Sequence, residues 1–198
     1  MYYLCPQYTT QLYLADVDYH IFGTGTQEAG RWVVGTAQTT VTTSYNVTNT
    51  ASWRSSGWRS DNDYVYQSDW QGNGNHVGVW WFDTSAIAAK TVKKVTLTVK
   101  RRSAGGYSSA VSHKFFKYTG NYKSGTATSY VSGSQLATMN LAWGGSGTVT
   151  LYDNGTGSTW LSGVTGICIY QSGGEDTLYS QCYGKSEYTA KLTVTYIA

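Results

Sequence analysis

From residue 41 onward, several runs alternate large apolar or aromatic side chains with polar ones. This alternation constrains the fold more than any other feature. Val, Leu and Tyr recur at alternate positions in four runs, at residues 41–47, 95–99, 149–151 and 192–196. The other positions hold mostly Thr, Ser or Lys. Because successive side chains of a strand point to opposite faces of its sheet, each run predicts a strand with one buried and one wet face.

The composition favours the same fold class. Aromatic residues make up 15% of the chain and charged residues 13%, and abundant Thr, Val and Tyr favour half-buried strands over helices. With a single proline, the turns must be made by the 23 glycines together with Asn, Asp and Ser. Short strands separated by such turns predict an all-β chain, an antiparallel β-sandwich or jelly roll.

The first 40 residues differ from the rest. The run QLYLADVDYHIF at residues 11–22 alternates weakly, and GTGTQEAG interrupts it at residues 23–30. A lone hairpin is marginally stable in water, so a small β appendage here needs another surface to pack on. We therefore predict an N-terminal attachment or oligomerisation segment at residues 1–40 and a β-sandwich domain at residues 41–198.

Two runs are apolar at consecutive positions, VGVWWF at residues 77–82 and GVTGICIY at residues 163–170. Strands of this kind are central in a sheet or covered on both faces. Since neighbouring strand residues point to opposite faces, one of Trp80 and Trp81 should lie in the core and the other outward or under a loop.

The segment after VGVWWF carries the one helical signal. Asp83 or Thr84 can cap a short helical turn near residues 84–89. We expect this turn to link two consecutive core strands, the first at residues 77–82 and the second containing VTLTV at residues 95–99.

Lys100, Arg101 and Arg102 form the one dense basic group, and we expect them to be solvated at the end of a strand. Proteins dedicated to nucleic acids concentrate Lys and Arg on a face or stripe, whereas the net charge here is only +3. We therefore expect no nucleic-acid partner.

Cys5, Cys168 and Cys182 show no C-x-x-C spacing, so the sequence suggests neither a zinc site nor a thioredoxin-like centre. The sequence leaves open a disulfide bridge between Cys168 and Cys182, which requires that two adjacent strands align the two residues. The start MYYLCPQ lacks the pattern of a signal peptide, and no run approaches the roughly 20 apolar residues of a membrane span. We expect no export signal and no membrane insertion.

A search for catalytic groups predicts no enzyme. The three histidines are scattered, no G-x-S-x-G motif occurs, and the acidic pairs lie in turn-like sequence without the apolar pocket that a general acid needs. Asp61 and Asp63 are weak alternative calcium ligands, but their spacing does not match an EF-hand loop and Asx-turns explain them without metal. We expect no cofactor.

Residues 53–75 combine three tryptophans with short polar side chains, a mixture suited to an uncharged polysaccharide. Sugars present C–H faces to aromatic plates and hydroxyls to carboxylates and amides. The alternative is that these tryptophans plug the end of the sandwich beneath its loops. The predicted site consists of stacking residues, hydroxyl acceptors and flanking groups: Trp58, Trp70, Asp61, Asp63, Tyr64, Asn73 and, from another loop, Tyr107.

Several longer stretches occur in an order typical of one family. They are WRSDNDYVYQSDWQGNGNHVGVWWF, KTVKKVTLTVKRRSAGGYSSAV, LAWGGSGTVTL, SGVTGICIY and AKLTVTY. Over residues 44–198 the chain resembles a β-rich C-terminal domain of tail and minor structural proteins from phages and prophages of Gram-positive hosts. Its FDTSAI is more loosely similar to the FDLS-I pattern of jelly-roll carbohydrate-binding modules. Residues 115–140 match poorly, and residues 1–40 have no counterpart.

The resemblance implies a virion protein, and the low charge, many aromatic residues and absent catalytic motifs fit it independently. We therefore expect a non-enzymatic fibre, spike or tip module whose β-sandwich binds a host-surface polysaccharide. Other virion proteins would attach through residues 1–40, and the family favours a homotrimer. Such a protein is assembled in the host cytoplasm and released by lysis. Two alternatives remain: a purely structural capsid or tail decoration or head-fibre subunit, and a carbohydrate-binding module of a secreted glycan-active enzyme.

Overall fold

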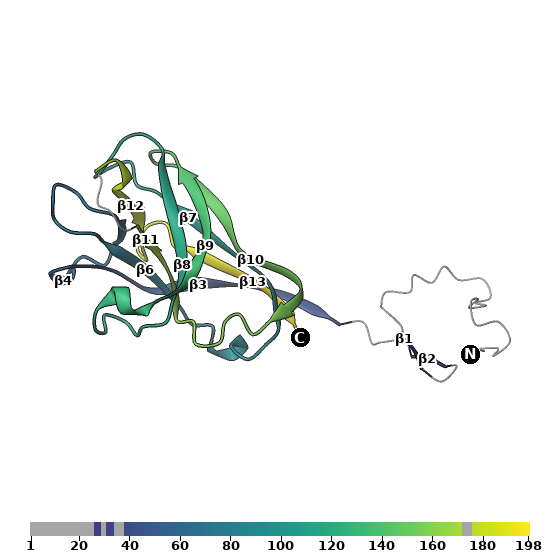
Figure 1. Ribbon diagram of the computed structural model, residues 1–198. Coiled ribbons are helices and arrows are strands. Elements are labelled where there is room, and N and C mark those ends of the chain that lie inside the picture. The colour runs from purple at the N-terminus through teal and green to yellow at the C-terminus, as the bar shows by residue number, and fades with distance from the viewer. Residues whose placement is uncertain (1–25, 29–30, 34–37, 172–175) are drawn as a thin grey trace. The chain divides into compact units, whose positions relative to one another are not determined.

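The computed structural model describes residues 26–28, 31–33, 38–171 and 176–198 (Figure 1). The chain divides into Met1–Thr39 and Thr40–Ala198, which are described separately. In the first unit, β1 (Thr26–Glu28) pairs antiparallel with β2 (Arg31–Val33). The alternating run at residues 11–22 lies outside the described residues, and the attachment role of residues 1–40 stays a prediction.

The second unit is an all-β antiparallel sandwich, as the alternation predicts. One layer contains β10 (Ser146–Ser158), β7 (Val92–Lys100), β13 (Lys191–Ile197) and the first half of β3 (Thr40–Arg54). The other contains the second half of β3, then β6 (Val77–Phe82), β11 (Gly166–Tyr170), β8 (Val111–Tyr118) and β9 (Val131–Leu141). The short β4 (Gly57–Trp58) pairs with the end of β3.

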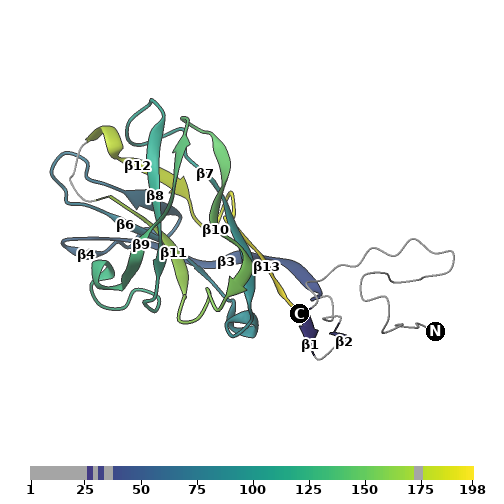
Figure 2. The same cartoon turned by 45° about the vertical axis from the view of Figure 1, so that its right-hand side comes forward.

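Strand β3 passes from one layer to the other, so the two layers form one folded sheet (Figure 2). Its first half pairs with β13, and its second half pairs with β6 after a register shift between Val47 and Asn49. A second, small sheet of β5 (Tyr64–Gln67) and β12 (Ser180–Tyr183) contributes Val65 and Cys182 to the core between the layers.

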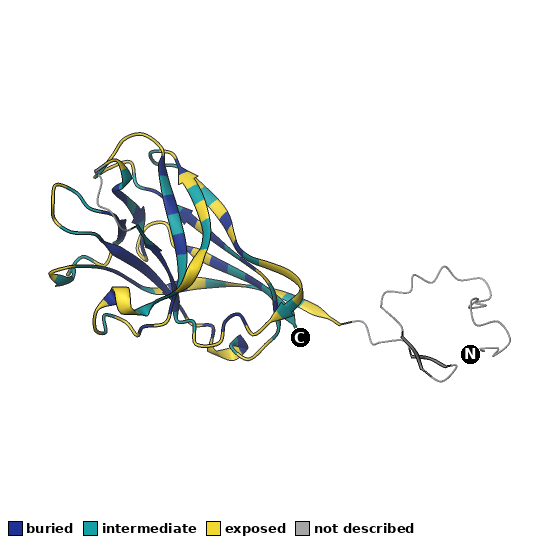
Figure 3. Ribbon diagram, in the orientation of Figure 1, coloured by how far each residue is buried: buried dark blue, intermediate teal, exposed yellow. Residues whose placement is uncertain are grey.

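Burial follows the predicted faces. Val95, Leu97 and Val99 of β7 are buried, and the residues between them are exposed or half-buried (Figure 3). In β6 every residue is buried, because the strand is covered on both sides. Trp80 lies in the core between the layers, and Trp81 lies in a second apolar cluster on the opposite face, so the predicted division of the two tryptophans is confirmed.

The close contact between β6 and β5 explains a glycine within the apolar run. A Cβ atom at Gly78 would lie 2.4 Å from the Val65 side chain and 2.5 Å from the Tyr66 carbonyl oxygen. Only a residue without a side chain allows the small sheet to approach this closely.

The predicted link between two core strands is also confirmed. A 3-10 turn, η1 (Ser85–Ile87), connects β6 to β7. Thr84 makes no capping hydrogen bond with its side chain; instead, the Asp83 carboxylate accepts hydrogen bonds from the backbone N–H and hydroxyl of Ser85. Two further turns, η2 (Ala127–Tyr130) and η3 (Asp176–Leu178), were not anticipated.

The expectation of a solvated basic group is wrong, most clearly for Arg101. Its guanidinium is fully buried and donates to the carbonyl oxygens of Ser109, Leu141 and Tyr107. Lys100 and Arg102 are half-buried and lie over tyrosine rings. Arg101 follows Val95, Leu97 and Val99 at the same two-residue spacing, so its side chain points inward. Its position along the strand, and not its charge, determines its burial.

Cys168 and Cys182 are both buried and free. They belong to different apolar clusters on the two faces of the sheet, so the bridge that the sequence left open does not form. Cys5 lies outside the described residues. Within the described part of the chain, no helix is long and apolar enough to cross a membrane.

Candidate functional site

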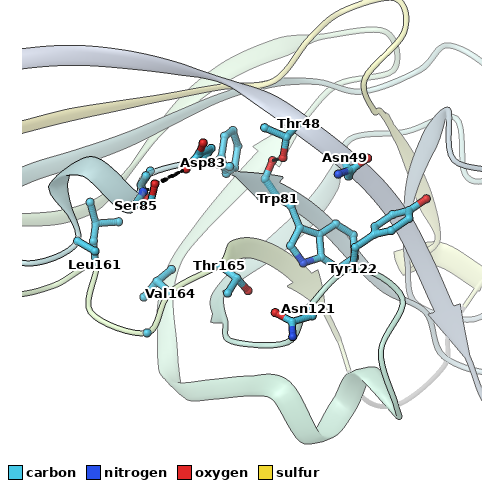
Figure 4. A pocket seen from close by; sticks show the side chains of 14 residues that line it. Thr48, Asn49, Trp81, Asp83, Ser85, Asn121, Tyr122, Leu161, Val164 and Thr165 are labelled. Atoms are coloured by element: carbon cyan, nitrogen blue, oxygen red, sulfur yellow. Dashed lines mark hydrogen bonds between the residues drawn. The ribbon is translucent and has the colours of Figure 1, made fainter.

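A pocket of about 360 Å³ opens at the end of the sandwich where β6 leads into η1 (Figure 4). This volume lies within the range of small-ligand sites. The end of β6 and the turn η1 form one side of the pocket, and Thr48 and Asn49 of β3 form another. The segments around residues 121–122 and 161–165 complete the lining. The lining comprises Thr48, Asn49, Trp81, Phe82, Asp83, Thr84, Ser85, Ala88, Asn121, Tyr122, Leu161, Gly163, Val164 and Thr165.

Two aromatic rings form one wall of the pocket. Trp81 and Tyr122 meet edge to face, with 5.3 Å between ring centroids and 81° between planes. The Trp81 indole N–H donates to the Gly120 carbonyl oxygen at 2.9 Å, and the side chain is only 5% exposed. Tyr122 is 41% exposed, so its ring is the aromatic surface that a ligand can reach.

The loop at residues 119–126, which carries Tyr122, is held in place from both sides. The Trp58 indole N–H donates to the Gly125 carbonyl oxygen at 3.0 Å, and the Lys123 ammonium donates to the Arg59 carbonyl oxygen at 2.8 Å. The Thr165 hydroxyl donates to the Gly120 carbonyl oxygen at 2.7 Å. These bonds fix the aromatic wall in advance, which lowers the entropy lost on binding a ligand.

Polar side chains lie beside this wall (Figure 4). The amides of Asn49 and Asn121 make no hydrogen bond to another described residue, and Asn49 is half-buried while Asn121 is exposed. Each amide therefore retains a carbonyl acceptor and an NH₂ donor for a ligand. By contrast, the Thr48 hydroxyl is already engaged, because it donates to the Trp81 carbonyl oxygen at 3.1 Å.

Asp83, an exposed residue of the lining, adds a negative charge to the pocket. Its carboxylate accepts from the Ser85 hydroxyl at 2.7 Å and the Ser85 backbone N–H at 3.2 Å. These hydrogen bonds hold the pKa of Asp83 below its ordinary value, so the carboxylate is ionised at neutral pH. An exposed ring, two free amides and one ionised carboxylate together suit a hydroxyl-rich ligand with an apolar face.

The structure separates the two tryptophans that the sequence paired as stacking residues. Trp58 packs on Trp81, 5.8 Å between centroids, behind the aromatic wall and outside the pocket lining. Trp70 packs against Tyr179, 5.4 Å between centroids, in another aromatic group that includes Tyr66 and His76. Both are half-buried.

The predicted hydroxyl acceptors make local hydrogen bonds. Asp61 accepts from the Asp63 backbone N–H at 2.9 Å, an Asx-turn, and from the Tyr66 hydroxyl. Asp63 accepts from the Ser186 hydroxyl at 2.8 Å. The Asn73 amide donates to the Trp70 carbonyl oxygen at 2.6 Å. These side chains stabilise the loop that carries them.

Tyr107 lies beside the aromatic group of Trp70, because its backbone N–H donates to the Tyr179 carbonyl oxygen at 3.4 Å, and Tyr64 lies against Arg102. The Arg102 guanidinium carbon is 3.6 Å from the centroid of the Tyr64 ring. Tyr107 is 40% exposed, and its carbonyl oxygen accepts from Arg101. Four of the seven predicted residues thus lie around Tyr66 and Tyr179, namely Asp61, Trp70, Asn73 and Tyr107, whereas Trp58 lies beside Trp81. None of the seven lines the pocket.

The pocket residues were missed because they come from four distant segments. The turn NYKSG at residues 121–125 has the chemistry of SAGGYSS, which drew attention to Tyr107, and the same reasoning applies to Tyr122. No pattern connects it to Asn49 or Asp83, since their proximity depends on the order of β3, β6, β11 and β8 in the sheet.

The described residues contain no group of three or more His, Cys, Asp or Glu side chains that could hold a metal ion. No protein-family model matches the chain, and no curated protein matches it at a significant level.

Proposed function

We propose that the chain is a non-enzymatic phage virion protein, a fibre, spike or tip module whose β-sandwich binds a host-surface glycan in the pocket beside Trp81 and Tyr122. The observation that supports it most is the exposed Tyr122 ring beside two free amides in a preformed hollow. The likeness of residues 44–198 to phage structural proteins supports the virion setting.

The geometry suits an uncharged sugar. One face of a pyranose stacks on Tyr122, and its hydroxyls donate to the Asp83 carboxylate and exchange hydrogen bonds with the amides of Asn49 and Asn121. Because loop 119–126 is already anchored to Arg59 and Thr165, the site needs little ordering on binding.

A glycan array of bacterial surface polysaccharides tests the proposal with the full chain. Tyr122→Ala and Asn49→Ala should each abolish the signal of a bound glycan while the melting temperature stays unchanged. Tyr107→Ala is the matched control, because Tyr107 is exposed to nearly the same degree, 40% against 41%. If only Tyr107→Ala lost glycan binding, the binding site would lie at the loops predicted from the sequence. If the full chain bound no glycan on the array, the structural decoration subunit would be favoured.

The oligomeric state is part of the same proposal. A fibre or tip module is expected to be a homotrimer attached through residues 1–40. Light scattering on the full chain and on residues 41–198 tests this directly. A full-length monomer at micromolar concentration would contradict it.

A further inference from the structure

A second surface combines cations with tyrosine rings. Five residues form this cation–tyrosine ladder: Lys100, Arg102, Tyr64, Tyr183 and Tyr188. The Lys100 ammonium lies 3.4 Å from the Tyr188 ring centroid and 5.8 Å from that of Tyr183, and the Arg102 guanidinium carbon lies 3.6 Å from that of Tyr64. The rings also contact one another, with centroids 6.1 Å apart for Tyr64 and Tyr183 and 4.7 Å apart for Tyr183 and Tyr188.

Strand pairing builds the ladder from distant segments. Tyr64 and Tyr183 are register partners across β5 and β12. Lys100 is the last residue of β7, and the Arg102 backbone N–H donates to the Gln181 carbonyl oxygen at 2.8 Å. Since β7 begins just after η1, Lys100 lies about 26 Å along the strand from the pocket end. The ladder and the pocket are therefore separate surfaces.

Neither cation of the ladder forms an ion pair within 4.0 Å with a described acidic side chain. Among the described residues the ion pair within 4.0 Å is Lys94 with Asp153, at 2.9 Å. The Lys100 ammonium makes no hydrogen bond to a described residue, and Arg102 donates one side-chain bond, to the Gln181 amide oxygen. Asp63, next to Tyr64 in sequence, accepts from Ser186. Both cations keep donors free for an anion.

Tyr188 supplies an accessible flat surface beside these donors. It is 49% exposed, more than any other large hydrophobic side chain that the structure describes. A polymer of sugar acids presents both matching groups at once, a carboxylate for Lys or Arg and a pyranose face for the ring. Because ring contacts already restrain both cations, less side-chain freedom is lost on binding.

We propose that the cation–tyrosine ladder binds an acidic polysaccharide whose carboxylates pair with Lys100 and Arg102 while a sugar ring stacks on Tyr188. This site is additional to the pocket and does not depend on it. Single-stranded nucleic acid fits less well, because such ligands need a basic groove along the backbone and successive stacking rings. The ladder has two cations, and the chain as a whole has 14 Lys and Arg residues.

The test measures binding of the full chain to polygalacturonate, hyaluronate and alginate, each beside its methyl-esterified form. At least one acidic polymer should bind, with affinity falling as salt rises, and its neutral ester should not. Lys100→Gln and Tyr188→Ala should each weaken binding by at least about tenfold. Thermal unfolding checks the fold of each variant, and Lys100→Gln remains informative if Tyr188→Ala is unstable.

Matched variants test whether binding belongs to the ladder. Lys94→Gln removes a cation of the same strand that is already paired, so it should leave binding unchanged. Tyr122→Ala alters the pocket and should also leave it unchanged. Binding to none of the acidic polymers, equal losses with Lys94→Gln, or tighter binding to oligothymidylate than to any acidic polymer would each overturn the proposal.

Discussion

The two faces of β6 differ in what covers them. On the inner face, Trp80 is fully buried beneath the opposite layer and the small sheet, and its indole donates to the Tyr183 carbonyl oxygen at 3.1 Å. On the outer face, Trp81 is covered by the loop at residues 119–126. A covering sheet packs continuously, whereas a covering loop leaves a hollow beside it. The inner face therefore provides stability, and the outer face provides the pocket.

The largest loss of stability is expected on the inner face. Leu97→Ala removes a fully buried side chain of β7 and should lower the free energy of unfolding by about 2–5 kcal/mol. Thr98→Ala, on the outward phase of the same strand, should change it by less than about 1 kcal/mol. Urea denaturation measures both, and equal effects would contradict the assigned faces.

Low pH should lower the free energy of unfolding through His113, a buried residue of the inner face. Two causes lower the pKa of His113 from its ordinary 6.5 to about 4. Burial of the ring is the larger cause, and the positive charge of Arg101 is the second. The unfolded chain therefore binds the proton first, and stability falls as pH drops from about 6.5 to 4, by at most about 3 kcal/mol. His113→Gln should flatten this part of the stability profile. An unaltered pH dependence in that variant would exclude His113 as its source.

Arg101 marks the end of the inner face, and its removal should have an intermediate effect. Arg101→Met leaves three carbonyl oxygens without their donor, which should cost about 2–3 kcal/mol. Arg102→Met, one residue further and half-buried, should cost less than about 1 kcal/mol. Similar values for the two variants would mean that the loop carbonyls find water instead.

The smallest effects are expected on the outer face. Trp58→Ala removes a half-buried ring that supports Trp81 and should cost about 1–2 kcal/mol. Tyr122→Ala removes an exposed ring and should alter stability by no more than about 0.5 kcal/mol. Thermal unfolding distinguishes the two. A large loss with Tyr122→Ala would make this ring part of the fold and weaken its assignment to the pocket.

The sequence alone predicted the fold class and many of the faces. Alternation placed Val95, Leu97 and Val99 inside, and the uninterrupted apolar run at residues 77–82 indicated a strand covered on both sides. Successive side chains of a strand point to opposite faces of its sheet. The face of each side chain can therefore be predicted from its position in the sequence alone. Arg101 was misplaced because its charge was given more weight than that same alternation.

The tertiary structure decided which residues meet. Alternation along a strand predicts which face a side chain occupies, but it carries no information about which strand lies next to it. Asn49, Trp81 and Tyr122 gather because β3, β6, β11 and β8 are neighbours in that order. The segment at residues 53–75 has the composition of a binding site, yet it contains β4 and β5, and its Trp58 and Trp70 pack in different aromatic groups. Burying a ring beside an apolar neighbour is favourable wherever the fold provides one.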